Sequence, residues 1–216
     1  MLVTARSVAR IAGALILTTA AAVGVAGAAH AEMYGDPAKA APYWRYQHQQ
    51  DCGLMAVADI VGQLSGHEPR QIGIELRGIF TPSNSHGGDV YFFDGTSPQD
   101  MVTLLQHYGV QSDMTSDNTL QGLENDLAAG HKVIAALNAE TIWNVAGDRS
   151  NPDHAVVVTG VDTGANVVHL NDSGTPNGRD EHIPLDVFTK AWSTSNNLLI
   201  VTRATGYDAI PWRPHL

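Results

Sequence analysis

The chain has 216 residues and a formal net charge of −10 at pH 7, with 12 lysines and arginines against 22 aspartates and glutamates. This acidic balance disfavours nucleic acids and anionic membrane surfaces as partners. The single cysteine, Cys52, excludes an internal disulfide framework, so its thiol is either an inert buried group or a reactive one.

The first 31 residues have the pattern of a secretory signal. Arg6 and Arg10 precede an apolar run, which ends in the small residues of the sequence AHA at positions 29–31. Cleavage after Ala31 would leave 185 of the 216 residues and, with two arginines removed, 10 basic residues against 22 acidic ones, a net charge of −12. An uncleaved membrane anchor is the alternative, and no later apolar stretch is long enough to span a bilayer. We expect a secreted or cell-envelope protein with no membrane attachment after cleavage.

The remaining chain is long enough for one domain with a sizeable core, and it shows no internal repeat or low-complexity block. We expect an extended lead-in over residues 32–42. The domain should cover residues 43–205, and a C-terminal tail should follow over residues 206–216.

The first expected helix begins at Cys52. Residues 54–64 are apolar at helical spacing, with Asp59 as an interruption, so this helix should be mostly buried. Asp51 is well placed to cap its start, and Gly66 to end it.

Three further helices should follow before the chain changes character. They are expected over Ile72–Ile79, from the cap residue Ser97 to the stop residue Gly109, and over the segment that stops at Gly130. Between the first two lies a long loop, Phe80–Pro98, rich in glycine, serine and proline. We interpret it as a surface loop in preference to a lid.

From residue 131 onward, short β-branched runs bounded by turn residues predict strands. The expected strands are Lys132–Ala139, His154–Asp162, Asn166–Asp172 and Asn197–Arg203, with a helix over Pro184–Trp192 between the last two. Helices followed mostly by strands indicate an α+β domain, in which an antiparallel sheet packs against a helical layer.

Three polar residues are placed to act together on this frame. Cys52 begins a helix, where the positive end of the helix dipole favours a thiolate. His154 opens one strand and Asp172 ends the next, so a hairpin centred on Thr163 would bring these two within roughly 5 Å. A nucleophile, a base and an orienting acid are the parts of a catalytic triad.

Each of these residues taken alone has a common structural role, as a core cysteine, a strand histidine or a turn-forming aspartate. Their order and joint placement favour the triad. An oxyanion would also need donors. The candidates are the Cys52 backbone N–H and one of Gln47, Gln49 and Gln50.

Glutamine before Cys-Gly at a helix start, then a strand opening with histidine and a strand ending in Asn-Asp, resembles the papain-like cysteine peptidases. More narrowly it resembles the bacteriocin leader (double-glycine) peptidases and their secreted relatives, family thirty-nine of the clan CA cysteine peptidases. The resemblance implies Cys52 as nucleophile, His154 as base and Asp172 as orienting acid. It selects Gln47 for the oxyanion hole, or Tyr46 where the spacing is one residue longer.

The resemblance covers Tyr43–Arg203, and no exporter part follows it. It implies a papain-like fold and a secreted cysteine hydrolase, which cleaves a peptide or isopeptide amide of a peptide or protein substrate without a cofactor. No HExxH motif and no helical histidine pair occurs, so we expect no bound metal. Two alternatives stay open: a non-catalytic secreted binding protein with this fold, and an acyltransferase with the same triad. The sequence indicates no oligomeric state.

Overall fold

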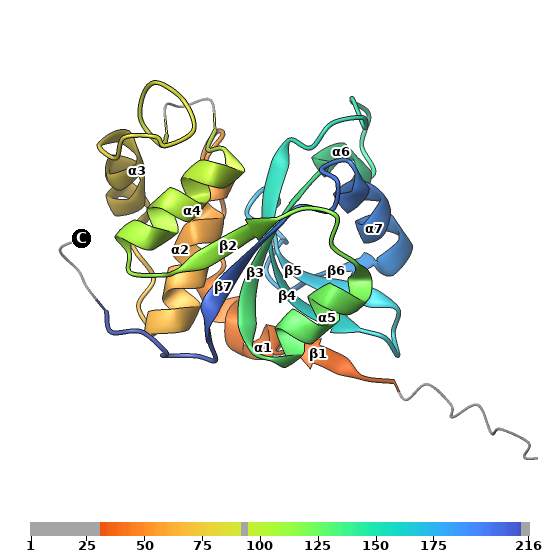
Figure 1. The fold of residues 1–216 in the computed structure, drawn as a ribbon. Helices are drawn as coiled ribbons and strands as arrows, with labels where there is room; N and C mark the ends of the chain where they lie inside the picture. The colour runs from red at the N-terminus through yellow and green to blue at the C-terminus, as the bar shows by residue number, and fades with distance from the viewer. Residues whose placement is uncertain (1–30, 92–94, 213–216) are drawn as a thin grey trace, which may run out of the picture.

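The computed structural model describes residues 31–91 and 95–212 (Figure 1). The expected signal segment, apart from Ala31, lies outside the described residues, as do the loop residues Phe92, Phe93 and Asp94. Within the described ranges, no helix has the length and apolar character needed to cross a membrane.

One antiparallel sheet is built from seven strands of the described residues, in the order β2-β7-β3-β4-β5-β6, with β1 paired to β4. The strands are β1 (Met33–Gly35), β2 (Ser112–Thr115), β3 (His131–Leu137), β4 (His154–Asp162), β5 (Val167–Asn171), β6 (Glu181–Pro184) and β7 (Leu199–Thr205). The four expected strands are confirmed as β3, β4, β5 and β7.

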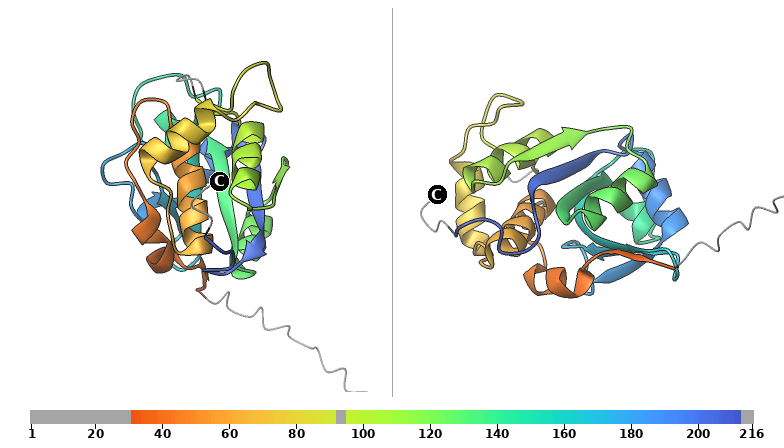
Figure 2. Two further views of the ribbon diagram at one scale, coloured as in Figure 1. Left: turned by 90° about the vertical axis from the view of Figure 1, so that its left-hand side faces the viewer. Right: turned by 60° about the horizontal axis from the view of Figure 1, so that its bottom comes forward.

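The expected helices are also present. The structure has α1 (Pro37–Ala40), a 3-10 turn η1 (Ala41–Tyr43), α2 (Cys52–Ser65), α3 (Gln71–Ile79), α4 (Pro98–His107), α5 (Leu120–Ala128), α6 (Ala139–Ile142) and α7 (Leu185–Ser193). The expectation of an extended lead-in is wrong, because this part of the chain contains β1, α1 and the start of η1. Hydrogen bonds to β4 and the fixed φ of Pro37 give this segment its strand and its helical turns. The right-hand view of Figure 2 shows it, in orange-red, against the sheet.

Helices cover both faces of the sheet, not one face as the sequence indicated. Ala155 and Val157 of β4 belong to the core with α2, α3 and α4, whereas Val156 and Val158 belong to the core with α5 and α7. Figure 1 shows these two groups of helices on opposite sides of the strands. Since successive side chains of a strand point to opposite faces, β4 can be apolar throughout.

The sequence predicts the C-terminal end of α2 correctly but not the cap at its N-terminal end. Gly66 ends the helix as expected, with φ of 70° and its N–H donated to the Gly62 carbonyl at 2.8 Å. The expected cap at Asp51 is wrong, because its backbone is turned (φ −103°, ψ 22°) and its side chain makes no capping bond. One carboxylate oxygen of Asp51 instead accepts a hydrogen bond from Gln71 at 3.0 Å, which joins the start of α2 to α3.

The β4–β5 hairpin forms in the expected place but in a different register. Val157 pairs with Asn171, so Asp172 is offset by two residues from the position opposite His154, and the expected centre of the hairpin is wrong. A bulge between Val158 and Gly160 shifts the register within the hairpin. The side chains of His154 and Asp172 are long enough to meet despite this offset.

Candidate active site

Cys52 lies at the first position of α2 and is half-buried. The rest of α2 is buried, so the helix is fixed by packing on both the sheet and α4. Gly53 permits the close approach of α4: a Cβ there would lie 3.0 Å from Thr96 and 3.2 Å from the sulfur of Met101. The cysteine is thus held at the positive end of a rigid helix dipole.

His154 and Asp172 form a buried pair. Nε2 of His154 lies 2.6 Å from Oδ1 of Asp172, and their side chains are 3% and 0% exposed. The second ring nitrogen, Nδ1, is therefore the one left to face Cys52, and the two groups interact: each shifts the pKa of the other. The structure brings together the three residues that the sequence pattern selected.

The charges of this group support one another. Burial acts to raise the pKa of Cys52, but the hydrogen bond and positive charge of His154 outweigh burial and lower it. Burial acts to lower the pKa of His154, yet Asp172 and the thiolate outweigh burial and raise this pKa to about 10. Burial of Asp172 is likewise outweighed by His154, so the pKa of Asp172 is lowered. The favoured state is a thiolate–imidazolium pair oriented by a carboxylate.

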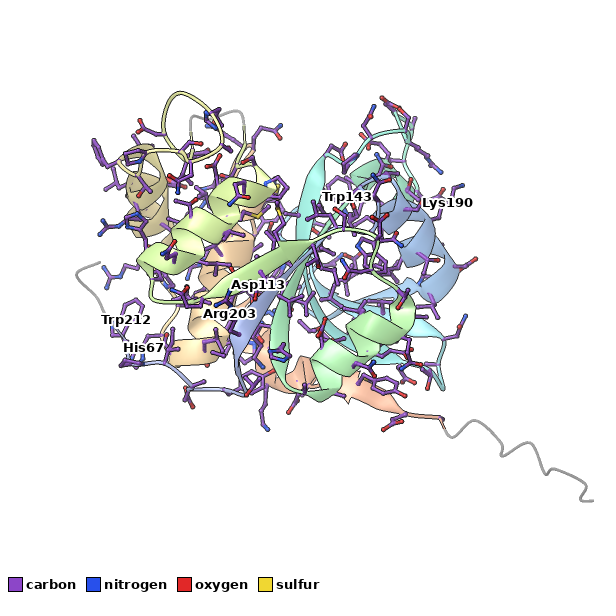
Figure 3. All side chains as sticks on the ribbon, in the orientation of Figure 1. His67, Asp113, Trp143, Lys190, Arg203 and Trp212 are labelled. Atoms are coloured by element: carbon purple, nitrogen blue, oxygen red, sulfur yellow. The ribbon has the colours of Figure 1, made fainter. Side chains whose placement is uncertain are left out.

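The Asp172 carboxylate is held from several directions. Oδ1 also accepts the Gly174 N–H at 2.7 Å, and Oδ2 accepts the indole N–H of Trp143 at 2.7 Å. The Trp143 ring, labelled in Figure 3, lies 5.1 Å from the His154 ring at a tilt of 59°. Trp44 donates its indole N–H to the backbone oxygen of Asp172 at 2.6 Å. Both oxygens of the carboxylate are therefore occupied before any substrate binds.

Sequence reasoning missed both tryptophans. Trp143 follows the single-turn helix α6, so no periodic pattern selects it. The available signal was chemical: a tryptophan packed inside a protein usually finds a partner for its N–H. Gly174 belongs to the same arrangement, since a Cβ there would lie 2.4 Å from the Trp143 ring and 3.0 Å from Cε1 of His154.

Glu181, the first residue of β6, is a further acidic group beside Asp172. Burial and the neighbouring charge of Asp172 raise the pKa of Glu181 to about 7. Its Oε2 is buried without a hydrogen-bond partner among the described residues. Near neutral pH this carboxyl can therefore be protonated while Asp172 keeps its charge.

The glutamines upstream of Cys52 have different surroundings. Gln47 donates its side-chain amide to the Gln49 carbonyl at 2.8 Å, and its Oε1 accepts a hydrogen bond from Ser173 at 3.0 Å. Gln50 lines the cleft in front of Cys52, whereas Tyr46 is 46% exposed. The assignment of Gln47 to an oxyanion hole stays a prediction.

The cleft itself has a volume of about 390 Å³. Its walls come from the approach to α2, from residues 95–101 at the start of α4, and from residues 152–155 at the start of β4. Cys52 and His154 are far apart in the sequence, but both line this cleft. A ligand bound there can therefore reach the thiol.

The glycine- and serine-rich loop is fastened next to this cleft. Asp100 of α4 is fully buried and accepts hydrogen bonds from Ser83 (2.7 Å), Ser85 (2.8 Å) and Ser97 (2.7 Å). His86, which also lines the cleft, lies 3.1 Å from the same carboxylate. This part of the loop is therefore anchored to α4 by polar contacts.

This fold is that of the C39 papain-like peptidases. A C39-like peptidase from Bacillus anthracis superimposes with a TM-score of 0.60 at 17% identity, covering 81% of this chain and 99% of that one. The peptidase domain of Streptococcus ComA, a bi-functional ABC transporter, gives a TM-score of 0.51 at 18% identity, covering 74% and 96%.

Residues 44–200 match the model of the Peptidase_C39 like family, and the chain belongs to this family. Uncharacterized proteins of Mycobacterium tuberculosis and Mycobacterium bovis are 46% identical over 202 residues, which cover 82% of this chain and 87% of theirs. The resemblance seen in the sequence is thus confirmed at the level of family and fold.

Proposed function

We propose that the protein is a secreted cysteine hydrolase that cleaves a peptide or isopeptide amide with Cys52, His154 and Asp172. The observation that carries this proposal is the buried His154–Asp172 pair, 2.6 Å apart, beside a thiol that opens to a cleft. Family membership supports a peptidase-like activity.

In the first half of the reaction, the Cys52 thiolate attacks the carbonyl carbon of the amide. A C–S bond forms, and the carbonyl electrons move to oxygen as an oxyanion. The Cys52 backbone N–H and one upstream glutamine donate to this oxygen. When the oxyanion collapses, the C–N bond breaks and the His154 imidazolium gives its proton to the leaving nitrogen.

In the second half, the neutral imidazole takes a proton from water, and the resulting hydroxide attacks the thioester. The C–S bond breaks, which releases a carboxylic acid and restores the thiolate and the imidazolium. Acyl transfer differs only in that an amine replaces the water. Asp172 keeps the imidazole oriented through both halves, and Trp143 packs against the pair.

Amide hydrolysis by the Cys52→Ala variant tests the proposal. We expect the wild-type protein to release new amines from a panel of peptide and peptidoglycan-type amides, and Cys52→Ala to release none while keeping its circular dichroism spectrum. Cys52→Ser, which replaces the sulfur by an oxygen of similar size, is the matched control for steric change. Equal turnover by wild type and Cys52→Ala would exclude a thiol mechanism.

A further inference from the structure

Two histidines and an aspartate meet on the β5–β6 pair, away from the Cys52 thiol. His169 of β5 and His182 of β6 are directly paired in the strand register, and their ring centroids lie 4.1 Å apart. Asp180, just before β6, lies with Oδ1 2.7 Å from Nδ1 of His169 and with Oδ2 3.6 Å from Nε2 of His182. One carboxylate therefore faces two imidazoles.

We propose that His169, Asp180 and His182 bind a divalent transition-metal cation, with Zn²⁺ as the best match. One donor atom from each residue lies within 4.8 Å of the other two. Imidazole nitrogen and carboxylate oxygen are ordinary zinc ligands at about 2.0–2.2 Å, which places donors of a tetrahedral ion about 3.4 Å apart. The Asp180 oxygens lie 2.7 Å and 3.6 Å from the histidine nitrogens, which is near that spacing.

The carboxylate is held in place by buried structure. Asp180 has a left-handed backbone, with φ of 52°, and its N–H donates to Oδ1 of Asn171 at 3.2 Å. Asn171 is 4% exposed and donates to the Ala40 carbonyl and to Asp59. The position of Asp180 is thus set by a residue that is itself anchored in the core.

The surrounding charges leave Asp180 available to a cation. Among the residues that the structure describes, no lysine or arginine forms an ion pair with Asp180. The preceding Arg179 lies 5.3 Å from the Trp44 ring instead. Glu181 belongs to the opposite face of β6, where its carboxyl interacts with Asp172.

Access to the cluster is one-sided. The side chain of His169 is 9% exposed, whereas that of His182 is 56% exposed and that of Asp180 is 35% exposed. A cation would enter from the solvent side and complete its coordination with water, since three protein ligands leave an open position. The ligands come from β5, from β6 and from the residue just before β6, so they lack the spacing of helical zinc motifs and the sequence pattern does not reveal them.

A cation here would fasten the edge strand β6 to β5 beside the segment that carries Asp172. Residues 172–180 connect the two strands, and the Asp172 N–H donates to the Gly178 carbonyl at 2.8 Å. The site would therefore stabilise the connection from which the Asp172 carboxylate projects.

Titration calorimetry with zinc sulfate alone tests the site. We use the full chain carrying Cys52→Ala, because the thiol is itself a zinc ligand. We expect one Zn²⁺ per chain with a Kd below about 10 μM, and His182→Ala in the same background should weaken it at least about tenfold. His107→Ala, which removes an exposed histidine of α4, is the matched control and should leave binding unchanged.

Thermal unfolding provides a second measurement that does not depend on heat of binding. Zinc should raise the Tm of the Cys52→Ala protein and of its His107→Ala derivative, but not that of the His182→Ala derivative. Because His182 is exposed, its replacement leaves folding intact. Absence of binding, or equal binding by the His182→Ala and His107→Ala proteins, would overturn the proposal.

Discussion

Trp143 provides the indole that holds the Asp172 carboxylate, and it has a counterpart in Trp44. The first donates to Oδ2 of Asp172 at 2.7 Å, and the second to the backbone oxygen of the same residue at 2.6 Å. The two indoles therefore touch one residue through different groups. Replacing each by phenylalanine separates the effect on the carboxylate from the effect on the backbone.

We expect Trp143→Phe to lower the free energy of unfolding by about 1–3 kcal/mol, because a buried carboxylate oxygen loses its donor. The pKa of Asp172 should rise and that of Cys52 with it, so alkylation of Cys52 at about pH 6 should slow. Trp44→Phe should leave the alkylation rate unchanged. Urea unfolding and intact-mass kinetics measure both effects, and equal slowing in the two variants would contradict this role of Trp143.

The upstream glutamines make a second comparison at the residue scale. If Gln47 supplies the oxyanion donor, its side-chain amide must give up the hydrogen bond to the Gln49 carbonyl and donate to the substrate oxygen instead. We expect Gln47→Ala to lower kcat by about 10²–10³ with little change in KM, and Gln50→Ala to lower it far less. Steady-state kinetics on the same amide substrate decide between them, and the reverse ranking would assign the donor to Gln50.

Much of the site was predictable from residue order, because a helix start and two strand ends are readable in one sequence. Cys52, His154 and Asp172 were selected in this way. Trp143, Gly174 and the offset between His154 and Asp172 were not, since they depend on a single-turn helix and a β-bulge. Neither of these leaves a periodic pattern in the sequence.

At the scale of elements, α4 shows what makes a helix readable. Ser97 accepts the Asp100 N–H at 3.2 Å, Pro98 follows at the first helical position, and Gly109 has φ of 80° just beyond the end. Strands β2 and β6 show the reverse case. They are four residues each, partly polar, and lie at the two edges of the sheet, so alternation alone could not identify them.

Two helical glycines test the packing of α2 on η1. A Cβ at Gly62 of α2 would lie 2.5 Å from the ring of Tyr43, whereas a Cβ at Gly73 of α3 would meet nothing within 4 Å. Both substitutions by alanine gain helix propensity, so the difference between them isolates the packing.

We expect Gly73→Ala to raise the free energy of unfolding by about 0.5–1 kcal/mol, the usual gain for alanine in a helix. Gly62→Ala should lower it by about 1–3 kcal/mol, because Tyr43 must move. Urea denaturation midpoints measure both values. Stabilisation by Gly62→Ala similar to that by Gly73→Ala would show that Tyr43 does not restrict this position.

For the whole molecule, the sheet with helices on both faces explains why β3 and β4 are almost continuously apolar. The sequence predicts the segments of α5 and α7 as helices, but it indicates a single helical layer and not a second one on the other face of the sheet. The face that each helix covers depends on which alternate residues of β4 it contacts, as Val156 and Val157 illustrate. That assignment requires the three-dimensional topology.

The residues just after the expected cleavage site, Glu32 and β1, belong to the folded domain. Glu32 exchanges hydrogen bonds with Thr163 in the β4–β5 turn, and β1 pairs with β4 directly after it. Cleavage after Ala31 would leave this strand complete. We expect the protein secreted by a bacterial host to have the intact mass of residues 32–216. A secreted chain that lacks β1, or a retained uncleaved chain, would contradict the proposed signal.

The central claim is that Cys52 is held as a thiolate by His154. Its lowered pKa means that the thiolate is present below the ordinary thiol pKa of about 8.5, and that it is lost only as pH falls through the lower value. The raised pKa of His154, about 10, keeps the imidazolium over the same range.

The most direct measurement is the rate of Cys52 alkylation by iodoacetamide as a function of pH, followed by intact mass. We expect rapid alkylation at about pH 6 in the folded wild type, and a profile moved to about pH 8 or above in His154→Ala. A wild-type thiol that reacts only above about pH 8, or only after unfolding, would contradict the claim.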